Sequence, residues 1–196
     1  MSAAGRVCIG FSKPYVAKYS NTGTTITYSD GRVLARGVDV SIEPETSDDN
    51  SFYADNTTAE KDPGTFTGGT LNLTVDGLHP DAEDLVMGLP VADDAGWVYY
   101  GDDQKIPYVG VGYIAKYMSD GETTYEPTII LKTAFNQIAK SHATSEESIN
   151  FQTQSLSARI YRSDDEKRRW KGYNNNEFAT EAEAEAVIKA RFNISN

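Results

Sequence analysis

Hydrophobic and polar residues alternate along most of this chain, in short runs rich in Thr, Val, Ile and Tyr. Such runs, separated by turn residues, are typical of an antiparallel β-sheet protein. The clearest run covers residues 38–44. Its apolar side carries Val38, Val40 and Ile42, and its polar side carries Asp39, Ser41 and Glu43. We therefore expect a strand with one face in the core and the other in water.

A second strand of the same design is predicted over residues 65–78. Its apolar side carries Leu71, Leu73 and Val75, and its polar side carries Asn72, Thr74 and Asp76. Further strands are predicted at 108–117, 128–135 and 149–161. In the last of these, polar Asn150 and Gln152 give way to apolar Leu156 at the same parity. This change predicts a strand that passes between two packed sheets, so the expected fold is a mainly β sandwich.

Turn and helix signals complete the predicted fold. The pairs Asp30-Gly31 and Asp120-Gly121 each predict a β-hairpin, because they supply the positive φ angles that a tight turn needs. Pro80 predicts the start of a short flanking helix that ends before Pro90. A C-terminal helix is predicted over 180–192, with a capping box at its start and a shallow packing face. That face carries Ala182, Ala186, Val187 and Ala190.

Residues 44–63 form the one long stretch with weak periodicity. It is rich in Asp, Asn, Ser and Thr, and two aromatic residues, Phe52 and Tyr53, lie in its middle. A polar segment of this length predicts a functional or disordered loop. We interpret the rest of residues 1–196 as a single domain around it.

Composition and charge argue against several classes of function. The chain has 196 residues, of which 39% are hydrophobic, enough for one ordinary core. No apolar run is long enough to cross a bilayer or to act as a secretory signal, so we expect the protein to stay in the cell that makes it. The formal charge of −11 opposes tight binding of nucleic acid.

Residues that carry chemistry are scarce. With Cys8 as its one cysteine and two histidines, His79 and His142, the chain lacks the ligands of a structural zinc site. Neither histidine stands at a recognisable spacing from a nucleophile or a paired carboxylate. Gly110 and Gly112 have the spacing of a dinucleotide fingerprint, but they lie inside a predicted strand with no helix after it. We predict no catalytic, cofactor or metal site, and therefore no enzyme.

Charged pairs and clusters are interpreted as surface features. Four Asp-Asp pairs lack the alternating ligands of a calcium loop and are typical of solvated turns. The basic cluster 167–171 directly follows Asp164, Asp165 and Glu166, so the segment is nearly neutral. We expect it to meet the acidic surface of another subunit.

The order of these features resembles the major tail protein, the tail-tube subunit, of long noncontractile-tailed bacteriophages. The resemblance runs along residues 13–192. It is carried by the strand 68–78 (GGTLNLTVDGL) with its short helix, by 107–113 (PYVGVGY), by the strand through Lys132 and Phe135, and by 150–153 (NFQT).

The resemblance implies a two-sheet sandwich whose six copies close into a ring, and rings that stack into a tube. Implied partners are further copies of the chain and the tape-measure, tail-tip and tail-terminator proteins, while phage DNA passes through without specific binding. The implied location is the virion tail, assembled in the cytoplasm of a bacterial host, with no membrane involved. Four strands per subunit would give a barrel about 48 Å across.

Site residues follow from combining the resemblance with the pattern. We expect the polar set to line the lumen, because an acidic or neutral wall repels phosphate: Asp39, Ser41, Glu43, Asn72, Thr74 and Asp76. The long loop would reach a neighbouring subunit through Asp48, Asp49, Phe52, Tyr53 and Lys61. Lys132 departs from a repulsive wall if it faces the lumen, and it would then need a carboxylate partner.

Other interpretations stay open at this point. The polar face is also what an ordinary outer solvated face looks like, because alternation alone does not say which side faces a lumen. Separately, the chain is also consistent with a monomeric or trimeric β-sandwich binding module, such as a virion decoration or receptor-binding domain, that recognises a partner through its loops. A small enzyme of unrecognised type would need a concave pocket that holds titratable groups.

Overall fold

The computed structural model describes residues 5–102, 104–144 and 151–194; in the segment 50–62 it describes the backbone, and the side chains of Ser51, Asp55, Asn56 and Glu60. The chain is mainly β, as the alternating runs predicted. In chain order the elements are β1 (Val7–Thr22), β2 (Thr25–Val33), β3 (Gly37–Thr46), β4 (Asn50–Ala54), β5 (Thr57–Asp62), β6 (Phe66–Val75), α1 (Pro80–Met87), β7 (Val109–Ser119), β8 (Glu122–Phe135), β9 (Gln154–Ile160), β10 (Lys171–Tyr173) and α2 (Glu181–Arg191).

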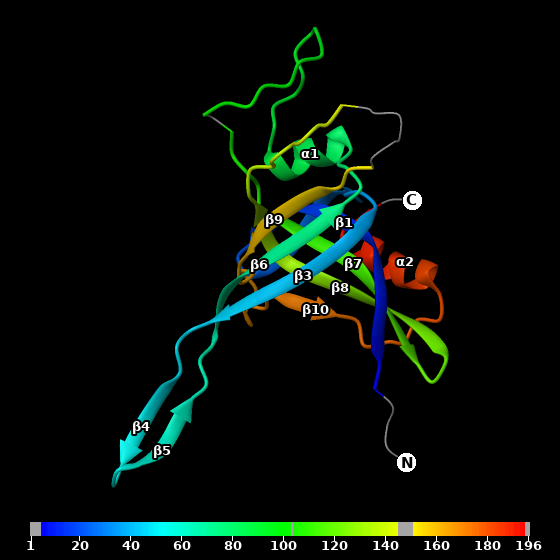
Figure 1. Ribbon diagram of the computed structural model, residues 1–196. Coiled ribbons are helices and arrows are strands. Elements are labelled where there is room, and N and C mark those ends of the chain that lie inside the picture. Colours follow the sequence, from blue (N-terminus) through cyan, green and yellow to red (C-terminus); the bar gives the residue numbers. More distant parts are fainter. Residues whose placement is uncertain (1–4, 103, 145–150, 195–196) are drawn as a thin grey trace.

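One antiparallel sheet of eight strands organises the molecule (Figure 1). Its order is β2-β1-β7-β8-β9-β6-β3, with β10 paired to β8, and β4 and β5 form a separate hairpin. The predicted packing of two separate sheets is not confirmed, because the ladder is continuous from β2 to β3. The join lies at the end of β8, which pairs with β7 along its length and with β9 only through residues 133–135.

The main core lies under β6 and confirms the alternation predicted there. Leu71, Leu73 and Val75 are buried in one cluster with residues of β1, β7, β9 and α1. In β3, Val40 and Ile42 pack against this cluster, but Val38 is 55% exposed. The prediction that Val38 packs in the core is wrong, because a register shift between Gly37 and Asp39 breaks the alternation at that point.

One predicted hairpin is confirmed and the other is wrong. Asp120 and Gly121 have φ angles of 50° and 85° and join β7 to β8. Asp30 also has a positive φ, of 54°, but β2 runs unbroken through it. There Asp30, in the left-handed conformation, forms part of a β-bulge against β1. The turn of the β1-β2 hairpin lies at residues 23–24.

Both predicted helices are present, with the predicted starts. The capping box of α2 is formed by Thr180 and Glu183. The packing face predicted for α2 is wrong, because the helix turns Ile188 and Phe192 inward and leaves all three alanines of that face exposed. Its core contacts are Ala184, Ile188 and Phe192.

Two glycines of β7 allow α2 to lie close to the sheet. A Cβ atom at Gly112 would lie 2.8 Å from the ring of Phe192 and 2.9 Å from Ile188. One at Gly110 would lie 3.1 Å from the ring of Phe192 and 2.5 Å from the ring of Tyr28 in β2. The glycines whose spacing matches a dinucleotide fingerprint therefore have a packing role in this fold.

Candidate assembly surfaces

The predicted lumen residues of β3 and β6 share one face of the sheet. Asp39 lies opposite Thr74, and Ser41 lies opposite Asn72, in the register of the two strands. The amide of Asn72 donates to the carboxylate of Glu43 at 3.3 Å. The structure thus brings five of the six predicted residues together: Asp39, Ser41, Glu43, Asn72 and Thr74.

Asp76 does not belong to this group. It lies just beyond the end of β6, and its carboxylate accepts hydrogen bonds from the backbone N–H of Arg36 at 3.0 Å and from its guanidinium at 2.5 Å. This local ion pair closes the end of the strand, so the parity argument that placed Asp76 with Asn72 stops one residue short of it.

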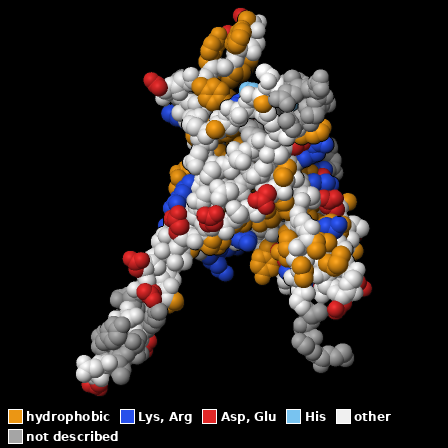
Figure 2. Space-filling view, viewed as in Figure 1, with side chains coloured by type: hydrophobic (Ala, Val, Ile, Leu, Met, Phe, Trp, Pro, Cys, Tyr) orange, Lys and Arg blue, Asp and Glu red, His pale blue; other side chains and the backbone are white. Residues whose placement is uncertain are grey.

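The polar face continues onto β9, which pairs with β6. There Arg159 is the one basic residue that joins the face, and its guanidinium bonds the carboxylate of Glu45 at 2.6 Å. That hydrogen bond lowers the pKa of Glu45 below its usual range and keeps the carboxylate charged. In Figure 2 the surface over β3 and β6 is mostly polar, with scattered Asp and Glu side chains.

The segment 44–63, predicted as a loop, is a β-hairpin arm. β3 continues to Thr46, and β4 then pairs with β5. Ser47 and Thr65 close its base, with the backbone N–H of Ser47 donating to the carbonyl of Thr65 at 2.9 Å. The arm projects away from the body (Figure 1). Polar residues hid it from sequence reasoning, because a hairpin without a buried face has no apolar alternation.

The predicted contact residues of the arm are only partly described. Asp48 and Asp49 lie in the exposed segment between β3 and β4. The side chains of Phe52, Tyr53 and Lys61 lie outside the described residues, although their backbone belongs to β4 and β5.

Lys132 was predicted to need a carboxylate partner if it faces the lumen, and the structure provides one. Its ammonium lies 2.7 Å from Asp164 and 4.4 Å from the centre of the Tyr108 ring. The hydroxyl of Tyr19 also donates to Asp164, at 2.8 Å. Hydrogen bonds from Lys132 and Tyr19 lower the pKa of Asp164 and favour its charged form, and this contact joins β8 to the segment after β9.

An exposed aromatic tip between α1 and β7 was missed by the sequence reasoning. Asp93 closes it by accepting from the backbone N–H groups of Ala95 and Trp97 at 3.0 and 2.8 Å. Trp97 is 66% exposed on this tip, close in sequence to exposed Tyr99. The signal was present, since a Trp and two Tyr within four residues of a Gly- and Asp-rich stretch are unusual for a solvated loop.

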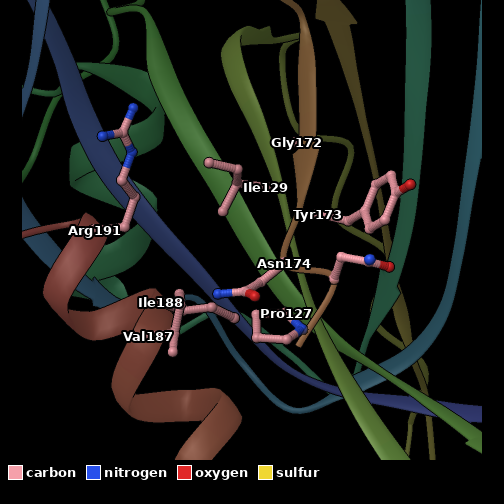
Figure 3. A pocket seen from close by; sticks show the side chains of 9 residues that line it. Pro127, Ile129, Gly172, Tyr173, Asn174, Val187, Ile188 and Arg191 are labelled. Carbon is pink, nitrogen blue, oxygen red and sulfur yellow. The ribbon is translucent and has the colours of Figure 1, made fainter. Parts of the chain in front are cut away.

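A pocket of about 300 Å³ lies between β10 and α2 (Figure 3). Arg191 extends from α2 on one side and Tyr173 from β10 on the other, over apolar side chains that include Ile129 and Val187. Its lining contains no carboxylate, histidine, cysteine or hydroxyl nucleophile other than the tyrosine. This pocket can hold an apolar group, but it offers no acid, base and nucleophile set.

Comparison with known proteins assigns no function to this chain, so its function is inferred from the fold and the surfaces described above. No family model matches this chain, and no curated protein matches it. Within residues 5–102, 104–144 and 151–194, no group of three or more His, Cys, Asp or Glu side chains is placed to hold a metal ion. In the same described part of the chain, no helix is long and apolar enough to cross a membrane.

Proposed function

We propose that this protein is a structural subunit that assembles into stacked rings, most simply hexameric ones, and so builds the tail tube of a long-tailed bacteriophage. The observation that carries the proposal is the polar face at the edge of the sheet. β3 is an edge strand, and its outward residues continue across β6 and β9 without an apolar patch. Pairing of β3 with a neighbouring copy would extend this face around a closed barrel and satisfy the edge.

The chemistry of the face suits a conduit for DNA. Three carboxylates, of Asp39, Glu43 and Glu45, stand on the same side of β3, and the one guanidinium among them is paired with Glu45. A wall of this kind repels phosphate and offers no unpaired cations whose counterions could be released by binding. DNA would therefore slide along the wall without being held.

The β4-β5 arm supplies a second reason for assembly. Its two strands pair with each other and not with the main sheet. An exposed two-stranded hairpin is marginally stable alone, so contact with another copy would stabilise it. The resemblance of the chain to tail-tube subunits adds the proposed partners: the tape-measure protein inside the tube and the tail-tip and tail-terminator proteins at its ends, with the assembled product located in the virion tail.

The first test is negative-stain electron microscopy of the purified protein across a concentration series. Rings or tubes with a central hole of about 40 Å are expected, since that is the clearance of a 24-strand barrel after side chains are added. Compact monomers at every concentration, with or without a tail-tip extract as initiator, would contradict the proposal.

The second test reverses charge on the polar face. Tubes that carry Asp39→Lys and Glu43→Lys should retain duplex DNA in a pelleting assay, whereas wild-type tubes should not. Glu122→Lys with Asp102→Lys is the matched control, because both residues are exposed and lie away from β3. Equal DNA retention by the two variants would remove the proposed lumen assignment.

The third test removes the arm. Deleting residues 48–60 should leave a folded monomer, because no described side chain of the arm belongs to either core cluster and its strands pair only with each other. Tubes should no longer form. Tubes of normal length from the deletion variant would refute the role of the arm.

The aromatic tip favours a second candidate function, a binding module. A hydrogen-bonded turn that presents Trp97 to solvent suits recognition of a partner, because aromatic anchors contribute much of the binding energy at interfaces. On this alternative the protein stays monomeric or trimeric in the concentration series, and Trp97→Ser weakens capture of a partner without changing the oligomeric state.

A further inference from the structure

In the segment 164–171, most of the acidic side chains face the protein and most of the basic ones face outward, which the sequence alone does not reveal. The segment contains three acidic and four basic residues and is nearly neutral as a string. In the structure two of the three carboxylates turn toward the protein. Asp164 accepts from Lys132 and Tyr19, as described above. Asp165 is 6% exposed and accepts from the hydroxyl of Ser163 at 2.9 Å.

Internal hydrogen bonds hold this arrangement in place. Burial alone would raise the pKa of Asp165, but hydrogen bonds from the backbone and guanidinium of Arg169 and from Ser163 outweigh it and lower the pKa below its usual range. The backbone N–H of Arg168 donates to the carbonyl of Asp165 at 2.9 Å and closes the turn. Next to it, the ring of Trp170 stacks on Phe66 at 4.5 Å.

Three cations are left facing outward: Lys167, Arg168 and Lys171, which we call the basic turn. Glu166 is the one carboxylate of the segment that is exposed beside them, so the outward surface keeps a net positive charge. All three cations are exposed. Among the described residues none of the three has an ion pair within 4 Å. A positive surface on a chain with a net charge of −11 points to an acidic partner.

The arm of the same protein has the complementary charge. Residues 48–62 contain five carboxylates and one lysine. Asp48, Asp55 and Glu60 are exposed there. The arm therefore presents a negatively charged surface. The hairpin that carries this surface projects away from the body (Figure 1).

The far end of the arm lies away from the basic turn of its own copy. The turn lies beside the base of the arm, where Trp170 stacks on Phe66 at the start of β6. Asp55 lies in the turn at the far end of the arm, about nine residues beyond Thr46, which corresponds to roughly 30 Å of strand. The end of the arm is thus held away from the cations of its own copy.

We propose that the basic turn is the docking site for the acidic arm of a second copy. This inference rests on the proposed function, in which the arm contacts a neighbouring subunit, and it adds the surface that receives it. Each copy carries one arm and one turn as unlike surfaces, so the contact is heterologous and repeats from copy to copy. Individual exposed ion pairs are weak, but one arm would form several with the same turn.

The test is an exchange of charge between the two surfaces. The turn variant carries Lys167→Glu and Lys171→Glu, and the arm variant carries Asp55→Lys and Glu60→Lys, two exposed positions beyond the base of the arm. Each alone should raise the protein concentration needed for assembly by about tenfold, measured by sedimentation velocity and electron microscopy. The protein with all four substitutions should return to within about threefold of wild type, because the complementary charges are restored with opposite sign.

The control variant, Lys18→Glu with Lys105→Glu, changes the net charge by the same amount at exposed positions outside the turn. It should assemble at nearly the wild-type concentration. Urea unfolding of each variant verifies that the fold is kept. The wild-type contact should also weaken as salt is raised from 0.05 to 0.5 M, since the charges are exposed.

Several outcomes would overturn the docking site. If wild type assembles and the turn variant assembles equally well, the site is wrong while the proposed function stands. The same holds if the fourfold variant is no better than the turn or arm variant. A wild-type protein that stays monomeric at every concentration overturns both proposals. Retention of duplex DNA by monomeric wild type, lost in the turn variant, would assign the basic turn to nucleic acid instead.

Discussion

Replacing Gly112 by alanine tests the close contact between α2 and the sheet. The added Cβ would lie 2.8 Å from the Phe192 ring and 2.9 Å from Ile188, both of which are fully buried. Neither neighbour is the end of a flexible exposed side chain, so the helix must shift or the strand must bend. Overpacking of this kind costs about 1–3 kcal/mol. We expect a loss of about 2 kcal/mol, which for a chain of this size lowers the Tm by about 4–8 °C.

Gly10 provides the matched control for this experiment. It lies in β1, and a Cβ atom there would have no neighbour within 4 Å. Gly10→Ala should therefore change the free energy of unfolding by less than about 0.5 kcal/mol. Both variants can be measured by urea unfolding followed by circular dichroism, with the slope of the transition checked for constancy.

A double-mutant cycle identifies the ring of Phe192 as the source of the cost. Phe192→Ala alone should destabilise by about 3–5 kcal/mol, because it empties a fully buried site. In that background the added methyl group at Gly112 has more room, so its own cost should fall by at least about 1 kcal/mol. Additive effects, or equal effects of Gly112→Ala and Gly10→Ala, would refute the reasoning.

Two further predictions concern α2. The Glu185 carboxylate is 16% exposed, and hydrogen bonds from Lys13 and Tyr15 lower its pKa from 4.5 to about 2. Its stabilising effect is therefore present above pH 4.5 and lost as the pH falls toward 2, so Glu185→Gln should cost up to about 2 kcal/mol at pH 7 and almost nothing at pH 2 in urea unfolding. An equal cost at both pH values would contradict this origin. Thr180→Ala removes the hydroxyl that caps the backbone N–H of Glu183 and should cost about 1 kcal/mol, read as a lower urea midpoint; Thr180→Ser should retain most of the stability, and an equal loss in both would argue against the cap.

Local signals in the sequence determined the features that depend on near neighbours. The alternation in 70–75 identified the buried face of β6, because side chains of a strand alternate whatever it pairs with. Thr180 and Glu183 located the start of α2, because a capping box is completed within four residues. Asp120-Gly121 fixed the β7-β8 hairpin in the same local way.

Only the tertiary structure decided the features that depend on distant partners. Asp30-Gly31 has the same residues as the true hairpin turn, but β2 pairs with β1 on both sides of it, and the positive φ angle forms a bulge. The face of α2 was set by the glycines of β7, which lie some 70 residues earlier in the chain and make room for Phe192. The separation of charge in 164–171 likewise depends on Lys132 and Tyr19, which come from other strands. Periodicity reports which side chains face the core, whereas the identity of the partner is a long-range property that no short window of sequence contains.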